Sequence, residues 1–72
     1  LCWAEFAEKV AVDDEGLSKL LVQAEAVRFD AGHCFLTASD SITRTSLLLF
    51  KDRLKAELLK VFGISFRVKI QD

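Results

Sequence analysis

The chain has 72 residues, of which 51% are hydrophobic, and its formal net charge is −1. This length leaves room for a single domain, residues 1–72, and the hydrophobic content excludes a disordered chain. The longest apolar run, residues 47–50, is far shorter than the roughly 20 residues that a membrane-spanning helix needs.

Because the chain starts at Leu1 and contains no methionine, we expect it to be a fragment of a longer protein. We expect that protein to be cytoplasmic, without membrane contact. The charges are unevenly distributed: residues 1–40 carry eight acidic and three basic side chains, whereas residues 41–69 carry seven basic and two acidic ones. Such an asymmetry allows an anionic partner to bind the C-terminal half.

Two short amphipathic helices are predicted at the N-terminus. The first runs from Leu1 to about Val12, and its apolar residues recur at helical spacing on one face: Trp3, Phe6, Ala7 and Val10. The acidic run 13–16 interrupts this pattern and favours the start of the next helix, because its carboxylates face the positive end of that helix dipole. The second helix is expected from about Leu17 to Ala24, with a core stripe of Leu17, Leu20, Leu21 and Ala24.

After the second helix, the period of the hydrophobic pattern changes from 3.6 residues to 2, which predicts a β-hairpin. Val27 and Phe29 alternate with polar residues over 26–30, and a second alternating segment covers 33–38. The connection between them, residues 30–32, contains Gly32, which can take the left-handed backbone conformation that a tight hairpin turn requires.

A long helix and a last strand complete the chain. Asp40 and its neighbouring serines form a helix-start signal, and Gly63 is placed to end a helix that reaches about Val61. The expected core stripe of this helix is Leu47, Phe50, Leu54, Leu58 and Val61. The final strand, residues 64–70, should place Ile64, Phe66, Val68 and Ile70 on one face. The order α-α-β-β-α-β predicts an α+β domain in which three helices cover one face of a three-stranded sheet.

No catalytic or metal-binding arrangement is recognisable in the sequence. His33 and Cys34 are adjacent on a predicted strand, so they point to opposite faces and cannot form a nucleophile–base pair. The acidic run 13–16 lacks the alternating ligands of a calcium loop, and no glycine-rich phosphate loop occurs. Cys2 and Cys34 match no metal spacing, and we expect two buried, reduced thiols rather than a disulfide. We therefore expect no enzyme activity, cofactor or metal in this fragment.

Two surfaces are candidates for binding. The uncovered sheet face should display Arg28, His33, Phe35, Thr37, Arg67 and Lys69. Of these, we predict that Arg28, Phe35, Arg67 and Lys69 bind a partner, either a protein or a nucleic acid whose bases stack on the ring. An ordinary solvated sheet face remains the alternative. On the long helix, Ile42 and Leu49 fall opposite the core stripe, close to Arg53 and Lys60, and could form a docking patch.

The whole pattern resembles the C-terminal domain of many bacterial gamma/tau clamp-loader subunits of DNA polymerase III. The residues that carry this resemblance are Trp3, Phe6, 17–21, Ala24, 27–37, 39–48, 54–63 and 66–70, which together cover nearly the whole chain. The N-terminal domain of the bacterial replication initiator, which has the same element order and a fold akin to K-homology domains, is similar too. This chain differs from the initiator domain in the second helix, where Leu20-Leu21 replaces the expected aromatic-Trp-Ile pattern. It also lacks the Gly-x-x-Gly loop of K-homology domains.

The resemblance implies a non-catalytic appendage that connects the clamp loader to other replisome proteins, a polymerase subunit or the replicative helicase. The alternatives are a nucleic-acid-binding module and an initiator domain that self-associates or recruits the helicase. The resemblance assigns no role to any single residue, so the predicted binding residues depend on the surface argument alone.

Overall fold

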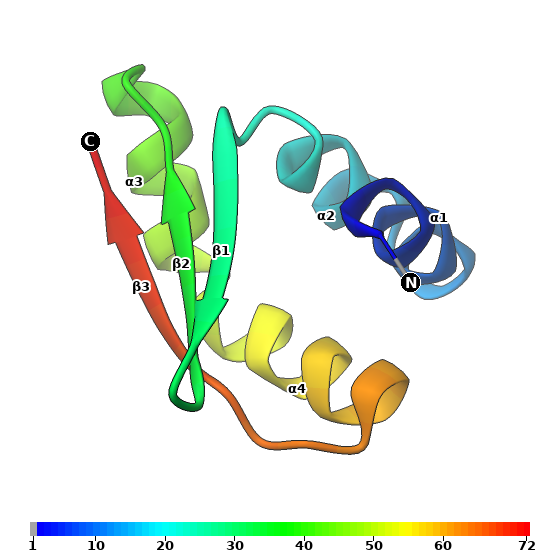
Figure 1. The fold of residues 1–72 in the computed structure, drawn as a ribbon. Coiled ribbons are helices and arrows are strands. Elements are labelled where there is room, and N and C mark those ends of the chain that lie inside the picture. The colour runs from blue at the N-terminus through cyan, green and yellow to red at the C-terminus, as the bar shows by residue number, and fades with distance from the viewer. Residues whose placement is uncertain (1) are drawn as a thin grey trace.

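A computed structural model describes residues 2–72 as an α+β domain with four helices and a three-stranded sheet (Figure 1). The elements in chain order are α1 (Trp3–Asp13), α2 (Glu15–Leu21), β1 (Ala26–Asp30), β2 (His33–Thr37), α3 (Ser41–Leu49), α4 (Lys51–Phe62) and β3 (Arg67–Gln71). The predicted fold class, helices on one face of a three-stranded sheet, is confirmed. The predicted start of the first helix at Leu1 lies outside the described residues.

Strand β2 lies at the centre of the sheet, antiparallel to β1 and parallel to β3. Ala31 and Gly32 form the hairpin turn with φ angles of 48° and 80°, so both central residues are left-handed, as in the tightest hairpin turns. The parallel pair requires a crossover connection, which α3 and α4 supply. The register places Arg28, Phe35 and Lys69 in one row across the sheet.

The hydrophobic core lies between the sheet and the helices. Its buried members come from every element except β1: Phe6, Ala7, Val10, Leu17, Leu21, Cys34, Leu36, Ala38, Leu47, Leu54, Leu58 and Val68. At one end of the core, Phe29 of β1 contacts the rings of Trp3, Phe62 and Phe66, with centroids 5.1 to 6.4 Å apart. These aromatic contacts connect the first helix, the hairpin and the C-terminal segment, which lie far apart in the sequence.

The predicted helix over 41–61 is in fact two helices, which meet at Phe50. This residue has φ −101° and ψ 17°, and its amide donates a hydrogen bond to the Ser46 carbonyl at 3.1 Å. A straight helix of this length would extend about 30 Å, whereas the longest axis of the whole domain is 29 Å. The bend lets α3 pack on α2 and β3 while α4 packs on α1 and β3. Phe50 lies at the corner and is 49% exposed, so its predicted core position is wrong.

Other element boundaries also differ from the prediction, and helix α2 ends at Leu21 rather than near Ala24. Helix α2 begins earlier, at Glu15, because the Asp14 side chain accepts a hydrogen bond from the Leu17 amide at 3.0 Å and caps the helix. Gly63 ends α4 in the left-handed conformation as predicted, but the strand begins only at Arg67. Residues 64–66 are needed to return the chain from the end of α4 to the sheet. Ile64 is therefore exposed instead of lying in the core.

Candidate binding surface

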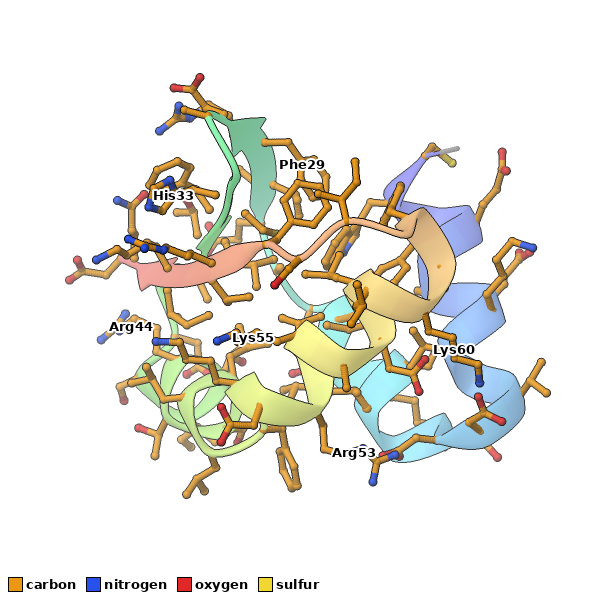
Figure 2. The ribbon with its side chains drawn as sticks, turned by 90° about the horizontal axis from the view of Figure 1, so that it is seen from below. Phe29, His33, Arg44, Arg53, Lys55 and Lys60 are labelled. Carbon is orange, nitrogen blue, oxygen red and sulfur yellow. The ribbon has the colours of Figure 1, made fainter. Side chains whose placement is uncertain are left out.

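The open face of the sheet brings together all six predicted surface residues. Alternate positions of the three strands point away from the helices, and the register aligns them in rows. Figure 2 shows His33 on the side of the sheet opposite the helices. This face, which we call the open face, consists of Ala26, Arg28 and Asp30 from β1, His33, Phe35 and Thr37 from β2, and Arg67, Lys69 and Gln71 from β3.

Phe35 is the centre of the open face. The guanidinium carbon of Arg28 lies 4.2 Å from the centroid of the Phe35 ring, which is a cation–π geometry. The His33 ring stacks against the same ring at a centroid distance of 5.5 Å and an interplanar angle of 22°. These contacts bring three planar groups together on one face of the β1–β2 hairpin.

The charges of the open face are predominantly positive. Arg28 forms an ion pair with Asp30 at 3.2 Å, whereas Arg67 and Lys69 form no ion pair with any residue of 2–72. Our sequence prediction missed Asp30, although the strand period places it on the same side of β1 as Arg28. Three cations thus face solvent with one carboxylate among them, and this distribution favours an anionic partner.

Cys34 and His33 lie on opposite faces of β2, as predicted. Cys34 is completely buried among core residues, and this burial raises the pKa of its thiol to about 11. The thiol is therefore protonated at neutral pH and is not a nucleophile. Both cysteines are free, but Cys2 is exposed, so the prediction of two buried thiols holds only for Cys34.

The predicted docking patch on the long helix does not form as expected. Ile42 and Leu49 are each 75% exposed on α3, which agrees with the prediction. Arg53 and Lys60 instead belong to α4 and reach toward the α1–α2 connection (Figure 2). Arg53 pairs with Asp14 at 3.0 Å and Lys60 pairs with Asp13; the hydrogen bond from Lys60 to that carboxylate raises the pKa of the lysine. The bend at Phe50 is the reason, since it turns α4 away from the exposed side of α3.

No cluster of three or more His, Cys, Asp or Glu side chains that could hold a metal ion occurs within residues 2–72. No helix in this part of the chain is long and apolar enough to cross a membrane. Comparison with known protein families, with curated protein sequences and with solved structures finds no match to this chain. The function must therefore be argued from the chemistry of the chain's own surfaces.

Proposed function

We propose that this chain is a non-catalytic protein-interaction domain of a bacterial DNA polymerase III gamma/tau subunit. It links the clamp loader to a polymerase subunit or to the replicative helicase in the cytoplasm, and it acts by binding. The observation that carries the binding role is the row Arg28–Phe35–Lys69 on the open face. The replisome context comes from the sequence pattern described above.

The composition of the open face supports protein binding. Aromatic and arginine side chains are the residues most enriched at the energetic centres of protein interfaces. The contacts of Arg28 with both Phe35 and Asp30 restrict its guanidinium before any partner arrives. Because this restriction lowers the entropy lost on binding, the face is preorganised for a partner that offers an apolar group surrounded by carboxylates.

Nucleic-acid binding is the second candidate, and one observation favours it. Arg67 and Lys69 are exposed cations beside the stacked group of Arg28, His33 and Phe35. Single-stranded nucleic acids bind surfaces that combine stacking rings with cations for the phosphates. Phosphate binding releases counterions, so this candidate predicts an affinity that falls steeply with salt concentration.

A binding assay with purified components tests the proposal. The immobilised domain is exposed in turn to the polymerase subunit, to the replicative helicase and to a single-stranded oligonucleotide. The Arg28→Glu/Phe35→Ala variant removes the centre of the open face and should weaken protein binding at least about tenfold, as loss of an interface hot spot does. The matched control, Lys19→Glu/Val22→Ala, makes the same kind of charge change and an apolar truncation at exposed positions around α2 and should bind like the wild type.

The other outcomes have definite meanings. Equal protein binding by the wild type and the Arg28→Glu/Phe35→Ala variant would contradict the open face as the site. Binding of the oligonucleotide alone, with an affinity that falls steeply between about 50 and 200 mM salt, would replace the proposed function with the nucleic-acid candidate.

A further inference from the structure

Strand β1 lies at one edge of the sheet. Its inner side pairs with β2, and no strand within residues 2–72 pairs with its outer side. It contributes no buried residue to the core, and its main packing is against β2. In Figure 2, β1 lies at one margin of the molecule. An edge strand of this kind presents unpaired backbone groups to a further strand.

The hydrogen bonds of the central strand show which residues of β1 point outward. The Ala38 amide, directly after β2, donates to the Gln71 carbonyl of β3 at 2.9 Å. Even-numbered residues of β2 therefore bond to β3, and odd-numbered ones bond to β1. The register gives these odd-numbered residues even-numbered partners in β1. Val27 and Phe29 thus direct their N–H and C=O groups away from the sheet.

The opposite edge of the sheet, β3, is protected against the addition of a strand. By the same alternation, the backbone groups of Val68 point outward there, but Val68 is only 2% exposed. The flanking Arg67 and Lys69 carry like charges and would repel the same strand of a second copy. Strand β1 has neither protection, because Phe29 is 43% exposed and neither lysine nor proline occurs in residues 26–30.

The charges of β1 are complementary to those of the same strand in a second copy. Arg28 and Asp30 carry opposite charges and lie on either side of Phe29 in the strand. When two β1 strands pair antiparallel about a two-fold axis at Phe29, Arg28 of each copy lies opposite Asp30 of the other copy. Within one copy these two side chains already form an ion pair at 3.2 Å, so the pairing creates a cluster of alternating charges.

The same register also uses the exposed ring and the free backbone groups. The N–H and C=O of Phe29 in one copy bond to those of Phe29 in the other copy. The two rings lie next to each other on the covered side of the sheet, where each already contacts Phe62 and Phe66. Cross-strand aromatic pairs stabilise a sheet, so the register that matches the charges also covers the exposed rings.

We propose that the domain forms a symmetric dimer in which two β1 strands pair antiparallel, centred on Phe29, and join the two sheets into one. This inference goes beyond the binding role proposed above and does not depend on it, since dimerisation involves the domain alone. Both open faces lie on the same side of the joined sheet and remain uncovered, so the dimer presents two of them to a partner. Because one pair of short strands is a small interface, we expect a dissociation constant of about 100 µM.

Sedimentation equilibrium with charge-exchanged variants tests the dimer and its register. The wild type should change from monomer to dimer between about 10 µM and 1 mM. Arg28→Asp or Asp30→Arg alone places like charges opposite each other at two positions and should weaken dimerisation at least about tenfold. An equimolar mixture of the two variants should form a heterodimer about as stable as the wild-type dimer, because each variant supplies the charge that the other lacks. Asp52→Arg makes the same charge change on an exposed position of α4 and should dimerise like the wild type.

NMR spectra of the wild type provide a test without any substitution. The amide signals of Val27 and Phe29 should shift as the protein concentration rises, while that of Val68 should not. If a variant failed to fold, this comparison would decide the question. A wild type that stays monomeric at about 1 mM, single variants that dimerise like the wild type, or a mixture that does not restore the dimer would each overturn the proposal. These assays contain no partner protein, so their failure is distinguishable from failure of the open-face proposal.

Discussion

The two faces of the sheet differ in how strongly the rest of the molecule constrains them, although the same three strands build both. On the covered face, Cys34, Leu36 and Val68 are at most 2% exposed. On the open face, Arg28 and Lys69 are exposed. The buried side chains of the covered face therefore stabilise the domain, whereas the side chains of the open face can contact a partner. Substitutions one residue apart on the same strand should consequently have very different effects.

Labelling of the two thiols should show the largest contrast. Cys2 is exposed and should react quickly with a thiol reagent, whereas Cys34 is buried and has its pKa raised to about 11 by that burial. Labelling of Cys34 requires the covered face to open. In a Cys2→Ser variant we expect Cys34 to react at least about a thousandfold more slowly in the native than in the denatured protein, in line with the free energy of unfolding of small domains. Similar rates in both states would contradict a closed core.

Truncation on the covered face should destabilise the domain more than truncation on the open face. Leu36 is completely buried, and Leu36→Ala should lower the free energy of unfolding by about 2–5 kcal/mol. Phe35→Ala, one residue earlier, removes mainly the contacts with Arg28 and His33 and should lower it by only about 1 kcal/mol. Urea denaturation followed by circular dichroism measures both changes. A larger effect for Phe35→Ala would mean that the open face belongs to a packed core.

The hairpin turn belongs to neither face, and relieving the backbone strain in it should stabilise the whole domain. Ala31 has a φ of 48°, which is unfavourable for a residue with a β-carbon. Ala31→Gly relieves this strain but makes the unfolded chain more flexible, so we expect a net gain of about 0.5–1 kcal/mol in the free energy of unfolding. Thermal denaturation of the variant and the wild type provides the measurement. A loss of stability would contradict the left-handed conformation at Ala31.

The smallest effect should come from the exposed carboxylates at the other end of the hairpin. The Glu25 carboxylate accepts hydrogen bonds from the hydroxyl and the amide of Ser39, and these bonds lower its pKa. Asp40 caps α3, and its hydrogen bonds from the Thr43 hydroxyl and amide lower its pKa as well.

A lowered pKa in the folded state means that these groups stabilise the fold above their unfolded pKa values of about 4, and that this stability is lost as the pH falls. The Glu25→Gln/Asp40→Asn variant should therefore have a slightly lower Tm than the wild type at pH 7. The difference should shrink as the pH is lowered through about 4 to 2. A difference that stays constant over this range would exclude the two carboxylates as its source.

Local periodicity in the sequence was enough to predict several features. The strand alternation correctly assigned Arg28, Phe35 and Lys69 to one face, and the turn signal correctly located the hairpin. The helical spacing identified the buried stripe of α1, and Gly63 correctly marked the end of α4. These features depend on residues within a few positions of one another, so the sequence by itself determines them.

Other features depend on contacts between elements that are distant in the sequence. No glycine or proline marks the bend at Phe50, which follows from the packing of α3 and α4 on different partners above a small sheet. The same bend brings Arg53 and Lys60 to the acidic α1–α2 connection. A hollow between α1 and α4 also could not be predicted from helical spacing, because its lining comes from both helices. Local spacing determines which side chains share a face of a helix or strand. Only the dimensions of the packed domain determine which other elements each face contacts.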